Sequence, residues 1–224
     1  MHQLFYVLRG IRRAHSLISV RPRKQPISFT HLALLFDIVQ VQYSNYDASM
    51  LLSAMSLAFF GMFRVSEYTS AYSESFVPEN TLLMEDVYLS GQTLHIHVKI
   101  SKTDPFRMGS VVRLVQIRSR FCPVRAFVRF VSFRGTSSGP LFLFENGSFL
   151  TRRKLSAVLH RIFPTANIDT HSFRIGGASA AASAGIPDSS IQILGRWSSN
   201  AFHRYLHYSD ADIVRFLSRM SSGY

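Results

Sequence analysis

The sequence contains little that would place it among disulfide-bonded, zinc-binding or membrane-spanning proteins. Its single cysteine, Cys122, excludes a disulfide framework and a cysteine-based zinc site within this chain. No apolar run reaches the roughly 18 residues that cross a bilayer, and the richest stretch, residues 50–63, ends at Arg64. Residues 1–20 scatter arginines among apolar residues and lack the hydrophobic block of a secretory signal. We therefore expect a reducing compartment and no membrane partner.

Acidic residues are also scarce. The chain has 13 Asp and Glu against 25 Lys and Arg, a net charge of +12 and a pI near 10.4. Such an excess indicates a polyanionic partner such as nucleic acid, because neutralised phosphates release their condensed counterions. A basic protein without such a partner is the alternative. From Lys102 to Arg134 there are eight basic residues and one acid, Asp104, and most of the basic residues are arginines, which suit phosphate groups.

The organisation of the chain indicates one main domain. Hydrophobic residues make up 47% of its 224 residues, which is enough for a packed core. Residues 4–14 have the pattern of a basic amphipathic helix, and residues 16–26 hold two prolines and three basic residues, as a linker does. We interpret residues 1–22 as the end of a preceding domain with its linker, and residues 23–224 as the main domain.

The periodicity predicts helices first and a small antiparallel sheet second. Ser28 or Thr30 can cap a helix to about residue 43, and Asp47 can cap a buried, apolar helix through about residue 63. Ser90-Gly91 between alternating runs indicates a hairpin. The expected strands are residues 82–89, 92–100 and 110–117, and the expected later helices are residues 123–134, 151–163, 171–184, 188–195, 199–207 and 210–220. The expected fold class is therefore α+β and mostly helical.

Two isolated cations could carry chemistry. Arg64 is expected at the end of an apolar helix, where a charge is costly unless it is paired. Glu67 follows one helical turn later and could hold the guanidinium in a salt bridge. Lys102 lies in the expected turn between the second and third strands, from which a flexible ammonium could reach a DNA groove. Taken alone, Arg64 is better explained as a surface arginine that ends the helix, and Lys102 as a solvated residue in a turn.

The segment HSFRIGGASAAASAG is the most distinctive local pattern. His171 and Arg174 are three residues apart and share one helix face at a helix start, where backbone N–H groups favour an anion. Gly176 and Gly177 open an alanine-serine run, so neighbouring segments can approach this helix closely. A tightly packed helix with an incidental histidine and arginine is the alternative interpretation.

Taken together, Arg64-x-x-Glu67, His171-x-x-Arg174, Gly195-Arg196-Trp197 and Tyr205 resemble the tyrosine recombinase (phage integrase) family in order and spacing. The segments HSFRIGGASAAASAG and LGRWSSNAFHRYL are most similar to the recombinases of DIRS-type retrotransposons and Cryptons. The resemblance covers roughly residues 23–215. The resemblance implies a tyrosine-recombinase catalytic-domain fold with a small antiparallel sheet. It also implies that residues 1–22 are the end of a truncated core-binding domain.

The resemblance implies DNA strand cleavage and rejoining through a 3′-phosphotyrosine intermediate. Arg64 and Arg174 would hold the scissile phosphate and stabilise its transition state. Tyr205 would attack phosphorus. Tyr208 is the second choice, because the spacing between Trp197 and Tyr205 is one residue shorter than the corresponding spacing in many bacterial members. The implied catalytic set is Arg64, Lys102, His171, Arg174, Trp197 and Tyr205.

The remaining roles also follow from the resemblance. His171 would act as general base or proton shuttle, and Lys102 would protonate the 5′-oxygen. Trp197 fills the position that is histidine in many members, and its indole N–H would donate a hydrogen bond to the phosphate. Such an enzyme needs no metal and no cofactor. Its partners would be double-stranded DNA and further copies of itself, in a homotetramer held by the C-terminal helix.

Two alternative functions stay open at this point. The first is a catalytically inactive, domesticated DNA-binding domain derived from a recombinase. The second is a type IB topoisomerase, which shares the chemistry but relaxes supercoils without exchanging strands. The expected location is the nucleus in a eukaryote and the cytoplasm in a prokaryote.

Overall fold

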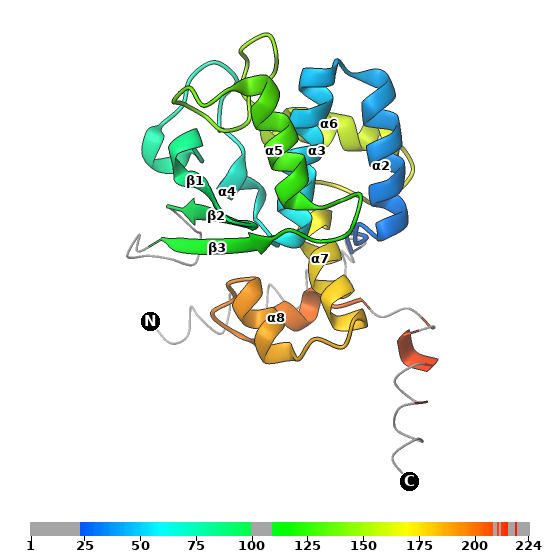
Figure 1. Ribbon diagram of the computed structural model, residues 1–224. Coiled ribbons are helices and arrows are strands. Elements are labelled where there is room, and N and C mark those ends of the chain that lie inside the picture. The colour runs from blue at the N-terminus through cyan, green and yellow to red at the C-terminus, as the bar shows by residue number, and fades with distance from the viewer. Residues whose placement is uncertain (1–22, 100–108, 208–209, 211, 215–217, 219–224) are drawn as a thin grey trace, which may run out of the picture.

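The structure is a computed structural model that describes residues 23–99, 109–207, 210, 212–214 and 218. In this part of the chain, helix α7 joins two groups of elements (Figure 1). The larger group holds the sheet and most of the helices, and the smaller one holds α8 and η3. The helices are α2 (Phe29–Gln42), α3 (Asn45–Phe60), α4 (Val65–Tyr68), α5 (Pro123–Arg134), α6 (Arg152–Ile162), α7 (Ser172–Ser183) and α8 (Asp188–Leu194), with 3-10 turns η1 (Pro78–Asn80), η2 (Met84–Asp86) and η3 (Asn200–Tyr205).

The first two helices begin at serines. The side chain of Ser28 accepts a hydrogen bond from the backbone N–H of His31 and caps α2, as one of the two predicted caps. The prediction of Asp47 as the cap of α3 is wrong. Ser44 caps that helix by accepting from the backbone N–H of Asp47, whose carboxylate instead accepts from the N–H of Glu145 at 2.8 Å. A serine three residues upstream offers the same capping chemistry, so the helix starts earlier.

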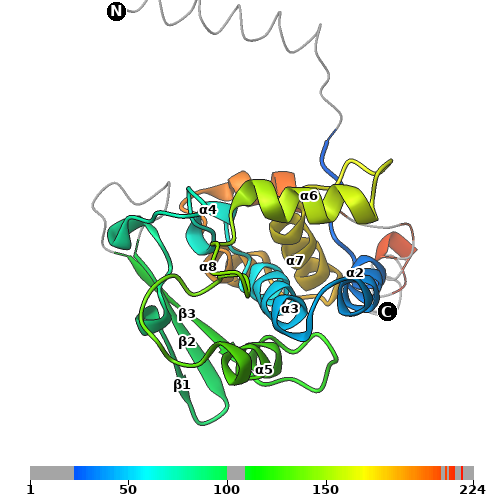
Figure 2. The same cartoon turned by 90° about the horizontal axis from the view of Figure 1, so that it is seen from above.

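Helix α3 is the centre of the core. Every residue from 48 to 59 is buried, as the continuous apolar run predicts. Figure 2 shows α5 and the sheet on one side of α3 and α6 and α7 on the other. The helix ends at Phe60 rather than near residue 63, so Arg64 does not close it. Arg64 is instead the residue before the first turn of α4.

The predicted antiparallel sheet is confirmed, with shorter strands. Its order is β1-β2-β3, with β1 spanning Val87–Ser90, β2 Thr93–Val98 and β3 Ser110–Val115. The strand predicted over 82–89 begins late because the carboxylate of Asp86 accepts from the backbone N–H of Leu83 at 2.8 Å and folds η2. Lys102 falls between β2 and β3 in the sequence, but it lies outside the described residues, so its hairpin position stays a prediction.

Two glycines allow α7 to cross the core at backbone distance. A Cβ added to Gly176 would lie 2.1 Å from the carbonyl oxygen of Ile27, and one added to Gly177 would lie 2.2 Å from that of Phe59. Carbon atoms do not approach carbonyl oxygens so closely. The close approach predicted for the alanine-serine helix is therefore confirmed, and it fixes where α7 begins relative to the end of α3.

Gly177→Ala is expected to lower the free energy of unfolding by about 3 kcal/mol, because the new methyl group must push α7 away from the backbone of α3. Alanine is otherwise the better helix former by about 1 kcal/mol. The sign of the effect therefore separates the two situations. Urea unfolding of the two proteins measures it, and an unchanged or raised midpoint would contradict the close approach.

A second apolar cluster joins α7 to α8 and η3. It consists of Met62, Ala178, Ala181, Ala182, Ile191, Trp197 and Phe202, all buried. The predicted helix at 188–195 is confirmed to within one residue, whereas the segment predicted over 199–207 is the shorter η3. Most of the predicted helix 210–220 and all of residues 1–22 lie outside the described residues. None of the helices that the structure describes is long and apolar enough to cross a membrane.

Candidate functional site

Arg174 lies at the junction of the two groups of elements and is 1% exposed. Its guanidinium donates to the carbonyl oxygen of Gly195 at 2.6 Å and to that of Met62, and it lies 4.1 Å from the centroid of the Trp197 ring. None of these three partners carries a negative charge. The two carbonyl oxygens and the indole ring therefore hold the buried guanidinium in one position.

Trp197 forms the floor beneath that guanidinium. Its side chain folds back over Gly195, where a Cβ would meet the indole ring at 1.6 Å. The residue is 9% exposed, and its ring lies 5.9 Å from that of Phe202 in the second cluster. The indole ring of Trp197 therefore packs against the guanidinium of Arg174. The predicted hydrogen bond from the indole to a phosphate stays a prediction.

Glu67 binds two arginines at once. One carboxylate oxygen accepts from Nη1 of Arg64 at 2.9 Å, as the sequence spacing predicts, and the other accepts from Nη2 of Arg196 at 2.8 Å. The second oxygen also accepts from the backbone N–H of Arg64 at 2.9 Å. The Glu67 side chain is 0% exposed, while those of Arg64 and Arg196 retain 17% and 13%. The buried carboxylate thus fixes two arginines that still reach the surface.

The ionisation of Glu67 follows from these partners. Burial is the largest single influence and raises the pKa of its carboxyl group. The charge of Arg196, and after it the hydrogen bonds and charge of Arg64, outweigh burial and hold the pKa below its ordinary value. Glu67 is therefore a carboxylate at neutral pH. One carboxylate paired with two guanidinium groups gives the three side chains a net charge of plus one.

His171 stands at the start of α7, beside the arginines. Its backbone N–H donates to the carboxylate of Asp169 at 2.8 Å. Burial lowers the pKa of its imidazole, Arg174 lowers it further against an opposing effect of Asp169, and Arg64 and Arg152 add to the lowering. These interactions place His171 within electrostatic reach of both Arg64 and Arg174. The histidine is neutral at physiological pH, as a proton acceptor must be.

The position of His171 predicts how stability depends on pH. The folded protein binds the imidazole proton only at lower pH than the unfolded chain, whose pKa has the ordinary value of 6.5. The free energy of unfolding should fall as the pH drops below about 6.5, and the fall should end once the pH is below the folded pKa. Chemical unfolding of the parent and His171→Asn between pH 5 and 8 measures this. We expect a weaker pH dependence in the variant, and identical curves would contradict the position beside the arginines.

The segment that carries Tyr205 is docked against α7. Phe202 is 1% exposed, and Leu206 packs against the same second cluster. The backbone N–H of His207 donates to Oγ of Ser179 on α7 at 3.1 Å. Anchors on both sides therefore hold the backbone at residue 205 beside the helix that bears Arg174. The side chain of Tyr205 is not among those that the structure describes, and Tyr208 lies outside the described residues.

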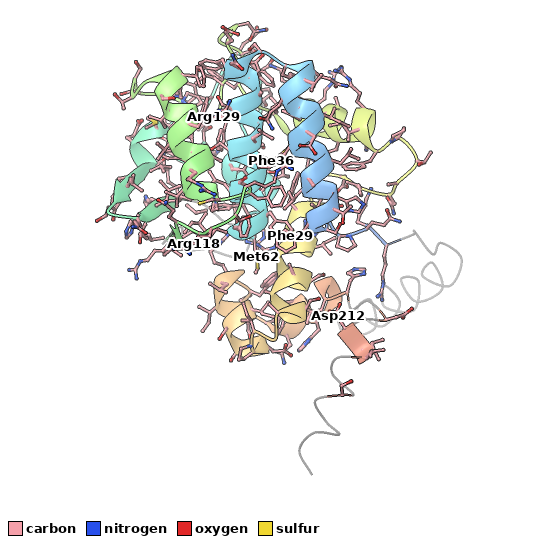
Figure 3. The ribbon with its side chains drawn as sticks, turned by 45° about the vertical axis from the view of Figure 1, so that its right-hand side comes forward. Phe29, Phe36, Met62, Arg118, Arg129 and Asp212 are labelled. Carbon is pink, nitrogen blue, oxygen red and sulfur yellow. The ribbon has the colours of Figure 1, made fainter. Side chains whose placement is uncertain are left out.

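Of the six residues named from the sequence, four converge in the folded chain: Arg64, His171, Arg174 and Trp197. They come from the starts of α4 and α7, from α7 itself and from the α8–η3 connection. Figure 3 labels Met62, whose carbonyl oxygen accepts from Arg174. Sequence reasoning passed over Arg196, which contacts Glu67. Its only signal was its place between Gly195 and Trp197 in the resembling block.

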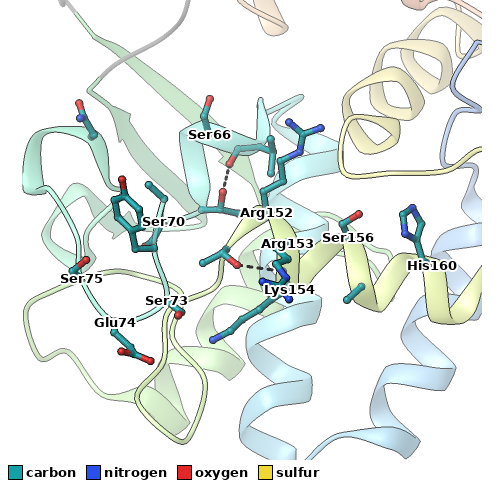
Figure 4. A pocket seen from close by; sticks show the side chains of 17 residues that line it. Ser66, Ser70, Ser73, Glu74, Ser75, Arg152, Arg153, Lys154, Ser156 and His160 are labelled. Carbon is teal, nitrogen blue, oxygen red and sulfur yellow. Dashed lines mark hydrogen bonds between the residues drawn. The ribbon is translucent and has the colours of Figure 1, made fainter. Parts of the chain in front are cut away.

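A basic groove adjoins this cluster. Arg152, Arg153, Lys154 and His160 of α6 line one side, and residues 69–75 line the other (Figure 4). The groove reaches the arginine cluster at Ser66, between Arg64 and Glu67 in the sequence, and at Arg152, whose charge acts on His171. Among the described residues, no group of histidine, cysteine and carboxylate side chains could hold a metal ion. The guanidinium groups of the cluster, beside a neutral histidine, can bind an anion.

No family model and no curated protein matches the sequence. Solved structures do match. They include XerH site-specific recombinase bound to a palindromic difH substrate in a post-cleavage complex (17% identity, TM-score 0.62, 89% of this chain and 54% of that one), and XerA recombinase (17%, 0.62, 89% and 65%). A lambda integrase dimer bound to a COC′ core site also matches (14%, 0.61, 84% and 49%). The chain spans about half to two thirds of their lengths, and it has the fold of a tyrosine-recombinase catalytic domain.

Proposed function

We propose that this chain is the catalytic domain of a tyrosine recombinase, which cuts and rejoins double-stranded DNA through a 3′-phosphotyrosine intermediate. The observation that carries the proposal is the convergence of Arg64, Arg174 and a neutral His171 beside the docked segment of Tyr205, on this fold. The similar XerH and lambda integrase structures are complexes with DNA. The net charge of +12 and the basic groove along α6 supply a surface for the same polyanion.

The proposed reaction begins at the scissile phosphate, held by Arg64 and stabilised by the charge of Arg174. The phenol oxygen of Tyr205 attacks phosphorus and its proton passes to the neutral imidazole of His171. The bond from phosphorus to the 5′-oxygen breaks, and Lys102 gives a proton to that oxygen. Rejoining reverses these steps, because the phosphotyrosine bond conserves the energy of the phosphodiester.

The finer assignments rest on the sequence. We propose a mobile-element recombinase of the DIRS or Crypton type, which acts as a homotetramer on DNA through its C-terminal helix. Its location would be the nucleus in a eukaryotic host and the cytoplasm in a prokaryotic one. The similarity of HSFRIGGASAAASAG and LGRWSSNAFHRYL to those elements supports the type. DNA complexes with neighbouring recombinases support the partner.

A suicide substrate tests the reaction. Full-length protein is incubated with a duplex nicked close to the cleavage site, so that the released fragment diffuses away and cleavage cannot reverse. We expect a denaturation-resistant adduct in which the 3′-phosphate is joined to a tyrosine. DNA binding without an adduct would favour the inactive, domesticated DNA-binding domain. Relaxation of supercoiled DNA without strand exchange would favour a topoisomerase.

A further inference from the structure

Arg196, which is not in the predicted catalytic set, contacts several parts of the site at once. Its Nη1 donates to the carbonyl oxygen of Gly61 at 2.9 Å, and its Nη2 donates to Glu67 at 2.8 Å. The guanidinium carbon lies 4.9 Å from the ring centroid of Phe63. The residue therefore joins the connection between α3 and α4 to the turn that follows α8.

The backbone at Arg196 adopts an unfavourable conformation to make these contacts. Its φ is +57°, in the left-handed region that favours glycine, and its buried Nε–H has no hydrogen-bond partner. This turn directs Arg196 toward Glu67 and the next residue, Trp197, beneath Arg174. Unfavourable features of this kind are concentrated at functional sites, where surrounding structure maintains them.

The charges of the site explain what Arg196 contributes. Glu67 paired with Arg64 alone would cancel the charge of Arg64, and the pair would attract a phosphate weakly. With Arg196 added, Glu67 and its two arginines together carry one net positive charge. A phosphodiester carries one negative charge, whereas the pentacoordinate transition state formed with a tyrosine oxygen carries about two. A net positive group at this position therefore stabilises the transition state more than it stabilises the bound substrate.

We propose that Arg196 is a positioning residue of the strand-cleavage reaction, which neutralises Glu67 so that Arg64 is held in place with its positive charge available to the phosphate. The inference rests on the proposed function. Arg196 acts through Glu67 and Arg64, and the donors of its two terminal nitrogens are directed to protein oxygens. Its removal should therefore slow the chemical step and leave DNA binding nearly unchanged.

The test is a double-mutant cycle in the full-length protein with the nicked duplex. Arg196→Met should lower the single-turnover cleavage rate by roughly 10- to 100-fold and change the apparent Kd for DNA by less than about 3-fold, as expected for one charge at close range. Adding Glu67→Gln to Arg196→Met restores the net charge of the site. We expect the double variant to cleave faster than Arg196→Met alone.

A purely structural role predicts the reverse. If Arg196 only braces the α3–α4 connection, Glu67→Gln removes a second brace and the double variant cleaves more slowly than Arg196→Met, which would overturn the proposal. Arg196→Lys provides a decision even if Arg196→Met does not fold. A lysine keeps the charge but loses the forked hydrogen bonds, so a rate within about 10-fold of the parent supports charge compensation, and a loss as large as that of Arg174→Lys overturns it.

The matched control is Arg129→Met, an exposed arginine in the middle of α5, outside the arginine cluster (Figure 3). It removes the same charge and should leave the cleavage rate at the parental value. Equal losses in Arg129→Met and Arg196→Met would show a general effect of net charge and overturn the proposal. If the parent protein itself forms no adduct, the proposed function fails first, and the role of Arg196 in cleavage falls with it.

Discussion

Tyr205→Phe is expected to abolish the covalent protein–DNA adduct, a fall of roughly 10⁴-fold or more, because the substitution removes only the attacking hydroxyl. The choice of nucleophile stays a prediction, and the structure describes the backbone around it. Phe202 is buried under the segment, and the N–H of His207 is held by Ser179 on α7, so residue 205 is fixed beside the helix of Arg174.

Tyr208→Phe is the matched comparison for the nucleophile. Both variants lose one phenol hydroxyl from the same segment, and only the loss at Tyr205 should prevent the reaction. The measurement is the amount of adduct on nicked DNA after denaturing electrophoresis, followed by peptide mapping of the linked tyrosine. Adducts that persist in Tyr205→Phe and disappear in Tyr208→Phe would identify the second tyrosine as the nucleophile.

Arg174→Lys is expected to lower the single-turnover cleavage rate by roughly 10³-fold, the upper range for loss of one transition-state donor. The substitution keeps the charge but not the planar fork. A lysine ammonium cannot donate to the carbonyls of Met62 and Gly195 and stack on Trp197 at the same time. The charge would then move from the position in which the fold holds it.

DNA binding separates this expectation from a loss of folding. The apparent Kd of Arg174→Lys should stay within about 10-fold of the parental value, because most of the phosphate contacts made by a basic surface lie elsewhere. Arg129→Lys serves as the control for an arginine-to-lysine change on an exposed helix face. A variant that binds DNA and cleaves within about 10-fold of the parental rate would contradict the proposed role of Arg174.

Several features of the fold and site were determined by the sequence itself, because they depend on neighbours a few residues apart. The apolar run of α3 can only be buried, the alternation of β2 favours a sheet, and the glycines of α7 permit backbone contact. The pairing of Arg64 with Glu67 follows from one helical turn of spacing. The start of α3 is also a local feature, but the prediction named Asp47 as its cap, and the residue that caps the helix is Ser44, three positions earlier.

Only the tertiary structure decided how these local pieces share charge. Arg196 reaches Glu67 across 129 positions of sequence, and Arg174 reaches Met62 across 112. No periodicity connects residues so far apart, because such contacts exist only after α7 has packed against α3 and the turn after α8 has closed over both. The resemblance identified the residues on either side of Arg196. The folded chain shows that the buried carboxylate of Glu67 pairs with both Arg64 and Arg196.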